Sequence, residues 1–354
     1  MAAHVSNSPG RLAVSGKMIL LRPDSNAVDP RFLAWSLATP RPQAFLDARK
    51  TGMAESQMNF ANEDLLAMPI ELPNMLEQHR ISDFLAAETG RIDRLVDLRM
   101  RQSSRLEERY ISAVSELTTP GISSSTDRDE TWPWLPARLA TARLGYMARV
   151  QSGVTVHGAR ERGASDAEFP YLRVANVQGE WVDLSEVKTI TIPPDMARRS
   201  TLRPGDVVMT EANGNPDNLG RGAVWKGEIA NMVHQNHVFA IRANQNRLLP
   251  TYFSALLAAT HGRRYFRFTS NQVGIATTSS SKVLDFPVPQ LSLEQQHRVV
   301  NEYERLRAAI TRTRKALATQ MHLFAERRQA LITAAVTGQF DVSTASGRNV
   351  TDGV

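Results

Sequence analysis

Cysteine is absent from the 354 residues of this chain. Its absence excludes disulfides, zinc sites built on thiolates and cysteine nucleophiles, and it is typical of proteins from a reducing cytoplasm. The sequence also lacks any run of about 18 apolar residues, which a membrane-spanning helix requires, and the charged-then-apolar N-terminal layout of a secretory signal. We therefore expect a cytoplasmic protein with no membrane partner.

Motifs for nucleotide and methyl-transfer chemistry are missing as well. No GxxxxGK[ST] phosphate-binding loop occurs, so the chain is not expected to hydrolyse ATP. Residues 215–218 share only their first two positions with the Asn/Asp-Pro-Pro-aromatic motif of amino-methyltransferases, and they predict a turn. His234 and His237 lack the neighbouring carboxylates and helical frame of a metal site. We expect no catalytic residue, no bound cofactor and no metal ion on this chain.

One short pattern keeps an enzymatic alternative open. Glu186 and Lys188 have the E-x-K spacing of many metal-dependent nucleases, and Asp166 lies twenty residues before Glu186. With these three residues the chain would be a stand-alone Mg²⁺-dependent DNA endonuclease. Because E-x-K is short and frequent by chance, we favour a chance occurrence.

The charge balance is mildly basic. Lys and Arg number 42 against 36 Asp and Glu, which gives a net charge of +6 and a pI of about 9.8. Such a balance favours a polyanionic partner such as nucleic acid. Charge alone does not separate this interpretation from that of an ordinary basic protein, and the length allows two or three domains.

An internal repeat organises the chain. The tripeptide Gln-His-Arg at 78–80 recurs at 296–298, and at this offset of 218 positions 8 of the 33 residues from 77 to 109 are identical. Further upstream Met18–Arg22 resembles Val238–Arg242 at an offset of 220. Residues from about 14 to 117 therefore repeat as about 234 to 335, whereas 134–233 has no counterpart. The repeat predicts a partial globular module, a long helix, a full module and a second long helix.

Each copy of the repeat ends in a segment that predicts a helix with one seam. In the first segment, 4-3 spacing places on one face Ile81, Leu85, Glu88, Ile92, Leu95, Arg99, Gln102, Leu106 and Ala113. In the second it selects Val299, Tyr303, Leu306, Ile310, Thr313, Leu317, Gln320, Phe324 and Leu331. One seam per helix is typical of a coiled coil. We favour antiparallel pairing of the two helices over packing of each helix on its own module.

These patterns, with helix stop signals at Pro120-Gly121 and Gly338, predict the domain boundaries. We assign 1–75 to the C-terminal part of a first globular module, 76–118 to a first spacer helix, 119–133 to a linker, 134–292 to a complete module, 293–338 to a second spacer helix and 339–354 to a flexible tail.

The complete module carries polar and basic residues suited to DNA. Side chains of Asn, Gln and Arg can contact base edges, and we place this role on Arg173, Asn176, Arg221, Gln235, Asn236, Asn271 and Gln272. Arg and Lys can hold phosphates, and the candidates are Arg263, Arg264, Arg267 and Lys282. For any single residue a turn or a solvated surface position is more common, so the prediction of nucleic-acid contact concerns the set.

The motifs around the helices resemble those of one family. The C-terminal string Glu-Arg-Arg-Gln-Ala-Leu-Ile-Thr-Ala-Ala-Val-Thr-Gly at 326–338 is similar to the end of the specificity subunit of type I restriction–modification systems. The first copy matches more weakly, through Pro69–Pro73, Glu77–Ile81 and Glu108–Tyr110. The resemblance implies an α+β fold, with mixed α/β target-recognition domains joined by two long helices that form an antiparallel coiled coil.

The resemblance also implies a function. In such subunits each target-recognition domain reads half of a split site in double-stranded DNA, and the helices fix the gap between the halves. The helices also dock modification (methyltransferase) subunits, and a restriction subunit then joins. S-adenosylmethionine, ATP and Mg²⁺ are expected on those partner subunits, and the specificity subunit itself carries no catalytic residues.

One departure from the family pattern concerns the first module, which lacks roughly the 95–100 N-terminal residues that the second copy would predict. We therefore expect one competent reader, at about 134–292. The chain would act as a half-subunit that pairs with a second specificity chain, or it would be an inactive truncated remnant that only scaffolds other subunits.

Overall fold

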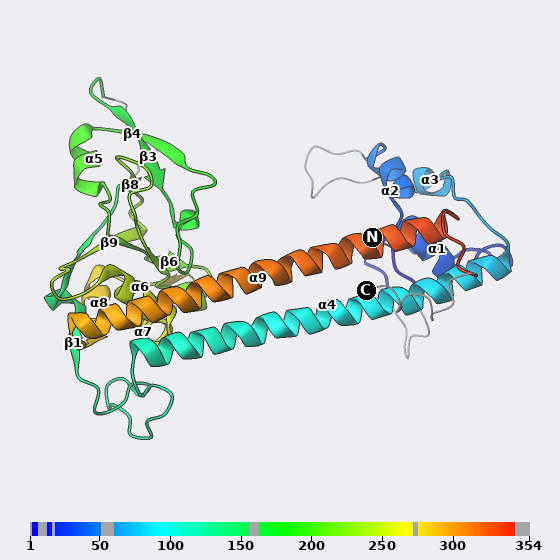
Figure 1. Ribbon diagram of the computed structural model, residues 1–354. Helices are drawn as coiled ribbons and strands as arrows, with labels where there is room; N and C mark the ends of the chain where they lie inside the picture. The colour runs from blue at the N-terminus through cyan, green and yellow to red at the C-terminus, as the bar shows by residue number, and fades with distance from the viewer. Residues whose placement is uncertain are drawn as a thin grey trace. The chain divides into compact units, whose positions relative to one another are not determined.

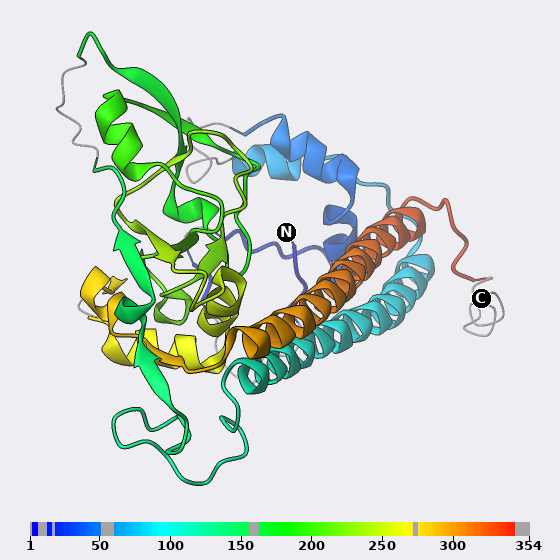
Figure 2. The ribbon, with the colours of Figure 1, turned by 60° about the vertical axis from the view of Figure 1, so that its left-hand side comes forward.

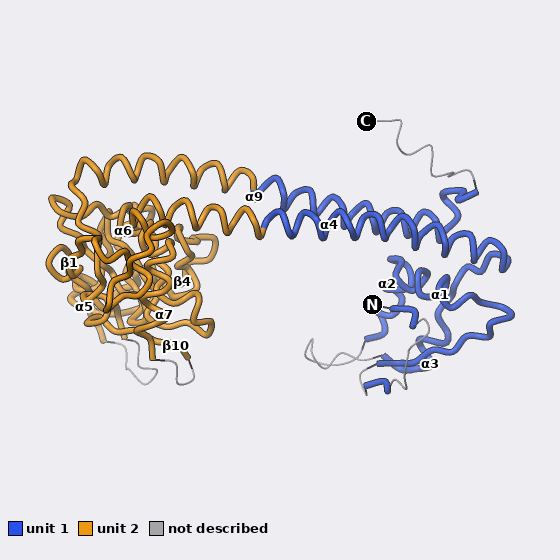
Figure 3. Tube along the Cα trace, turned by 90° about the horizontal axis from the view of Figure 1, so that it is seen from below, with its two compact units in different colours: residues 1–103, 314–354 blue, residues 104–313 orange. Residues whose placement is uncertain are grey.

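The computed structural model describes residues 2–5, 13–15, 18–50, 60–155, 163–271 and 275–343. Two compact units divide the chain, Met1–Ser103 with Arg314–Val354 as unit 1 and Ser104–Thr313 as unit 2 (Figure 3). Each unit contains part of two continuous helices of 44 residues, α4 (Met75–Thr118) and α9 (Leu293–Val336) (Figure 1). The two long helices predicted from the repeat are therefore present.

Within the described ranges, no helix combines the length and the apolar character that spanning a bilayer requires.

The seam of α4 differs in part from the predicted one. Inward positions follow a 4-3 spacing from Gln78 through Ser82, Leu85, Thr89 and Ile92, all of which are buried. The predicted seam coincides with the buried positions at Leu85 and Ile92. Its prediction of inward-facing side chains was wrong at Leu95, which is 42% exposed, and at Gln102, which is also exposed. On α9, Thr313 and Gln320 are likewise exposed. Polar Ser82 and Thr89 occupy the seam, and a search for apolar periodicity could not detect them.

Unit 1 is helical in the part of it that the structure describes. Besides the parts of α4 and α9 it contains α1 (Pro30–Leu37), α2 (Pro40–Asp47) and α3 (Asn62–Leu66). In its core Phe32 of α1 packs with Ile81 and Leu85, near the start of α4, and with Ile332 and Ala335, near the end of α9. Contact between the start of one helix and the end of the other makes their pairing in this unit antiparallel.

The C-terminal string at 326–338 forms the end of α9, where two of its residues have clear structural roles. Arg328 forms an ion pair of 3.2 Å with Asp93 of α4, and Gly338, with φ of +69°, adopts the left-handed conformation that commonly ends a helix. Val342 is also buried in the core of unit 1. The chain thus keeps contact with unit 1 up to this residue, whereas 344–354, the remainder of the predicted flexible tail, lies outside the described residues.

Unit 2 contains two main sheets (Figure 2). The four-stranded sheet has the order β2 (Ala148–Gln151), β9 (Val238–Ala243), β5 (Val207–Thr210) and β7 (Gly222–Val224). The three-stranded sheet has the order β4 (Lys188–Ile192), β3 (Ala167–Leu172) and β8 (Val233–His234). Two small antiparallel pairs join β1 (Thr141–Arg143) to β11 (Pro287–Pro289) and β10 (Ala276–Thr277) to β6 (Ala212–Asn213).

Both faces of the central strands β5 and β9 are buried over most of their length, which explains their continuous apolar runs. Val207 and Met209 of β5 pack toward α6 (Pro250–Ala258) and α7 (Thr260–Thr269), whereas Val208 packs into a second apolar cluster with Leu172 and Trp225. The shorter elements of this unit are the helices α5 (Pro194–Ser200) and α8 (Ser280–Leu284) and the 3-10 turns η2 (Leu144–Tyr146), η3 (Val174–Asn176) and η4 (Pro216–Asn218).

In unit 2 the end of α4 meets the start of α9, again antiparallel. Tyr110 and Val114 of α4 pack with Tyr303 and Ile310 of α9, and Ala255 of α6 closes this cluster. The α6 helix is the repeat counterpart of α1. Each module is therefore held by the start of its own long helix and the end of the other.

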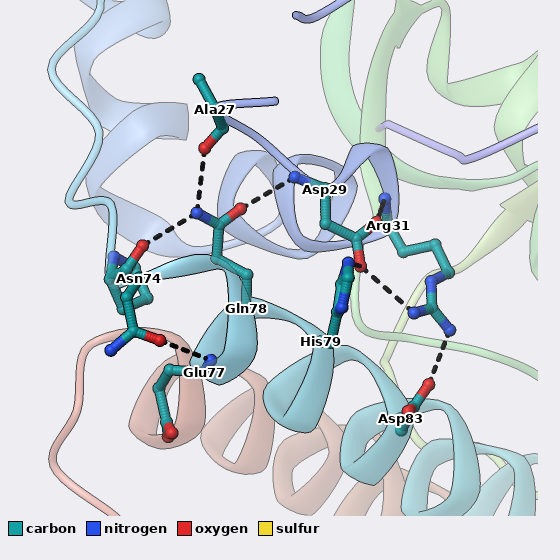
Figure 4. Close-up of polar contacts among 9 residues, drawn as sticks. Ala27, Asp29, Arg31, Asn74, Glu77, Gln78, His79 and Asp83 are labelled. Atoms are coloured by element: carbon teal, nitrogen blue, oxygen red, sulfur yellow. Dashed lines mark hydrogen bonds and ion pairs between the residues drawn. The ribbon is translucent and has the colours of Figure 1, made fainter. Parts of the chain in front are cut away.

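A buried glutamine joins the first module to α4 (Figure 4). Gln78 accepts a hydrogen bond from the Asp29 N–H at 2.8 Å, and its amide donates to the carbonyls of Ala27 at 3.1 Å and Pro73 at 2.8 Å. Beside it, Arg31 bridges Asp29 and Asp83. Burial would raise the pKa of the Asp29 carboxyl, but the Arg31 N–H and guanidinium outweigh burial and hold that pKa below its usual value.

The second module repeats this joint. Gln296 accepts from the Leu249 N–H at 2.9 Å and donates to the carbonyls of Arg247 at 2.9 Å and Leu291 at 3.0 Å. The partners are the repeat counterparts of those of Gln78, at offset 220 for the two loop residues and 218 for the residue before the helix. The internal repeat thus extends to individual hydrogen bonds.

Candidate nucleic-acid interface

One group of predicted base readers lies where β3 and β8 end. The Gln235 side chain accepts a hydrogen bond from the Val174 N–H at 3.2 Å, which ties the β8–β9 turn to η3. Asn236 is half-buried in the same turn, and its amide lies 3.4 Å from Nε2 of His237. The structure thus brings Arg173, Asn176, Gln235 and Asn236 together on two adjoining loops.

Asn176 has a different role from the predicted one. It is 5% exposed, accepts from the Arg173 N–H at 2.9 Å, and donates to the carbonyls of Asp183 and Glu186, both at 2.9 Å. Its amide is used within the loop, so its prediction as a base reader was wrong. We assign it to holding the 176–186 loop in shape, because a buried amide that already has three partners cannot turn toward a base.

The E-x-K pattern forms a charge cluster around Arg173. Glu186 lies 2.8 Å from Nζ of Lys188 and 3.5 Å from Arg173. The positive charges of Lys188, which has the larger effect, and Arg173 hold the pKa of the Glu186 carboxyl below its usual value. Among the described residues no three His, Cys, Asp or Glu side chains group closely enough to hold a metal ion. This geometry does not favour the endonuclease alternative.

A second group gathers around α7 and the 211–221 loop. Arg221 is half-buried and donates to the Asn218 side chain. Burial and the nearby positive charge of Arg263 lower the pKa of Arg221. Among the described residues no carboxylate lies within ion-pair distance of either guanidinium. Positive charge of this kind favours contact with an anion such as phosphate.

The remaining phosphate candidates surround this pair less closely. Arg267 forms an exposed ion pair of 2.9 Å with Asp217, and Arg264 is exposed. Lys282 donates to the Thr269 carbonyl at the end of α7. Asn271 is exposed and bridges to Thr277 beside β10. The prediction for Gln272 lies outside the described residues.

His237 connects the two groups. Its Nδ1 lies 3.0 Å from a carboxylate oxygen of Glu211, at the start of the 211–221 loop, and the Glu211 N–H donates to the His237 carbonyl at 2.9 Å. His234, by contrast, is fully buried with Nδ1 2.6 Å from the Val238 carbonyl, and burial lowers its pKa. The two histidines have separate environments.

One contact between the loop after η3 and the long helices was not predicted from the sequence. Tyr110 of α4 and Tyr303 of α9 both donate to Oε1 of Glu180, which lies in the loop after η3, and the Tyr303 distance is 2.7 Å. Arg307 of α9 also donates to the Glu180 carbonyl at 3.3 Å. The partners lie 70 and 123 positions from Glu180 in sequence, so no local pattern could reveal the contact.

Comparison with known proteins agrees with the resemblance seen in the motifs. The chain is 21% identical over 295 residues to the type I restriction enzyme StySPI specificity subunit of Salmonella potsdam, which covers 81% of this chain and 60% of that relative's length. It is 35% identical over 69 residues to the type I restriction enzyme EcoEI specificity subunit of Escherichia coli, which covers 20% of this chain and 12% of that relative. No protein-family model matches the sequence.

A solved structure shares the fold. A chain from a structure described as the structural basis underlying complex assembly and conformational transition of the type I R-M system aligns with a TM-score of 0.65 and 18% identity, covering 89% of this chain and 73% of that chain. The predicted combination of mixed helix and sheet with two long helices is therefore confirmed, with the strands of the described residues all in unit 2, as is the resemblance to type I specificity subunits.

Proposed function

We propose that this relative of the type I specificity subunits is a DNA-recognition subunit in which residues 134–292 read part of a double-stranded site. The likeness to the StySPI specificity subunit over 81% of this chain is the observation that carries this proposal, and Arg221 and Arg263 belong to the basic group that would meet the DNA backbone. Arg221 is half-buried and loses part of its hydration, and a DNA phosphate beside it would stabilise its charge, whereas Arg263 is exposed on α7 and open to a second phosphate.

We assign base reading to the loops on either side of Arg221 and Arg263. Asn236 and Gln235 in the β8–β9 turn, with Asn271 beside β10, carry amides that can pair with base edges. Arg267 would exchange its exposed partner Asp217 for a phosphate at little cost, because exposed ion pairs contribute about 0–1 kcal/mol. Arg264 and Lys282 would add phosphate contacts, and Asn176 would keep the neighbouring loop in shape.

We further propose that the chain is non-catalytic and cytoplasmic, and that its long helices dock methyltransferase subunits. A restriction subunit would then join the complex. The name of the Salmonella relative and the fold shared with a chain of a type I R-M structure support these roles. S-adenosylmethionine, ATP and Mg²⁺ would be bound by the partner subunits, and a second specificity chain would supply the other half-site.

The test begins by selecting bound sequences from random DNA duplexes with the full chain in complex with a methyltransferase subunit. Affinity for the selected duplex is then measured by anisotropy across a salt series. Arg221→Ala and Arg263→Ala should each weaken binding by about 1–3 kcal/mol, or roughly fivefold to 150-fold, and flatten the salt dependence by about one charge.

Arg199→Ala is the matched control, since Arg199 is exposed on α5 and outside the candidate set. It should leave both affinity and salt dependence close to the parent values. Binding that shows no sequence preference would contradict the proposed function, as would an Arg221→Ala, Arg263→Ala double variant with unchanged affinity and salt dependence.

A further inference from the structure

Unit 1 contains an open apolar pocket of about 190 Å³. Its lining includes Leu21, Leu33, Leu37, Leu65, Met68 and Ile70. Leu66 also borders it and is 78% exposed. Apolar side chains around an open pocket in a helical unit call for an explanation, since burying them would be favourable.

The repeat supplies that explanation. At the offsets of 220 and 218, the six lining residues correspond to Ile241, Phe253, Leu257, Val283, Phe286 and Val288. All six are buried members of the largest apolar core of unit 2. The residues that line the pocket of unit 1 thus correspond to one half of the apolar core of unit 2.

The other half in unit 2 comes from residues that unit 1 does not repeat. Trp134, Leu135 and Leu144 fill the core from one segment, and Val207 and Met209 fill it from β5. The first segment is also fixed through its backbone, because β1 pairs with β11 and the Leu144 N–H donates to the Phe286 carbonyl at 2.9 Å.

The strand positions of unit 1 are equally open. Residues 69–71 correspond to β11 and residues 18–22 to β9, yet none of the described residues of unit 1 forms a strand. Met18 is 69% exposed and Leu20 51% exposed, whereas their counterparts Val238 and Ala240 are buried in β9, where both pair with β5 and Ala240 also pairs with β2. Unpaired apolar strand positions are templates for strand addition.

We propose that unit 1 receives a polypeptide segment that resembles residues 132–151 of this chain. Apolar anchors equivalent to Leu135 and Leu144 occupy the pocket, and the strand between them, equivalent to β1, pairs with residues 69–71. This docking surface is independent of DNA reading, because it uses none of the residues assigned to DNA.

The probe is a fluorescein-labelled peptide of residues 132–151, and its binding to the full chain is followed by anisotropy. We expect binding that Leu66→Arg weakens at least tenfold. Leu76→Arg is the matched control, because Leu76 is 61% exposed in the same unit but does not line the pocket. Both positions are exposed, so neither variant should disturb folding. A peptide carrying Leu135→Asp and Leu144→Asp should not bind.

Hydrogen exchange locates the bound peptide. Slower exchange at residues 18–22 and 69–71 on binding supports the proposal. Slower exchange at 238–242 and 287–289 instead would mean that the peptide acts on unit 2, and the proposal would then be wrong. Absence of binding, equal effects of Leu66→Arg and Leu76→Arg, or protection of 18–22 already in the free chain would also overturn it, the last because the chain's own residues would cover the site.

Discussion

Replacing Glu180 by alanine is expected to destabilise unit 2 by about 2–4 kcal/mol. Its carboxylate accepts hydrogen bonds from two buried hydroxyls, those of Tyr110 and Tyr303. Removing the acceptor leaves each hydroxyl without its partner, at a cost of about 1–3 kcal/mol per buried group, and nearby solvent reduces the sum. Glu180→Gln keeps an oxygen acceptor and loses only the charge, so it should cost about 1 kcal/mol.

Thermal and urea unfolding of the full chain measure this effect. For a unit of this size 1 kcal/mol corresponds to a shift in Tm of about 2–4 °C. A double-mutant cycle of Glu180→Gln with Tyr303→Phe isolates the pair and should give a coupling free energy of about 1 kcal/mol. Glu302→Gln is the control, because Glu302 forms only a surface pair with Arg305 on the same helix.

A second readout separates a local role from general loss of stability. Glu180 joins the lobe of β3, β4 and β8 to the helix pair, so Glu180→Ala should speed hydrogen exchange in this lobe more than in the β5–β9 core. A coupling free energy near zero, or a uniform change in exchange across unit 2, would refute the assigned role of Glu180.

Three further predictions concern the joints, the pH dependence and one loop. Gln78→Ala and Gln296→Ala should each destabilise their own unit by about 2–3 kcal/mol, because each leaves a backbone N–H and two carbonyls without partners. Unfolding of each unit, monitored by hydrogen exchange, measures this effect. If only one of the two variants destabilises its unit, the two joints are not equivalent. Burial lowers the pKa of His261 to about 4, below its unfolded value of about 6.5. The free energy of unfolding should therefore be highest above pH 6.5 and fall by roughly 3 kcal/mol as the pH drops to 4. Urea titrations at several pH values measure this loss, and His261→Gln should make the free energy of unfolding less dependent on pH. Gly220 has φ of +77°, and a Cβ there would lie 2.4 Å from the Phe266 ring, so Gly220→Ala should disorder the 211–221 loop and weaken DNA binding, whereas Gly214→Ala, which meets nothing within 4 Å, should not.

The sequence predicted the fold well because its strongest signals were repetition and length. The offset that related Gln78 to Gln296 also located α1 against α6 and the open pocket against a filled core. The seam was only partly predicted, because Ser82 and Thr89 are buried there and apolar periodicity does not detect polar seam residues.

The predicted DNA-contact set, by contrast, could only be chosen by residue type. Asn176 and Asn236 look alike in sequence, yet one is buried and bonded three times within its loop and the other lies at the edge of a turn. The distinction depends on tertiary contacts, as does the proximity of Arg221 to Arg263, which lie 42 positions apart in the chain.

The glutamine joints have a consequence for how such a chain can be remade. Every atom that Gln78 or Gln296 binds belongs to the backbone, and the side chains at those positions differ between the copies: Ala27 against Arg247, Asp29 against Leu249, Pro73 against Leu291. A joint of this kind does not depend on the composition of the module that it holds. A foreign module of the same backbone course could therefore be spliced in front of either helix while its attachment stayed the same, and under the proposed function such a splice would change the DNA target.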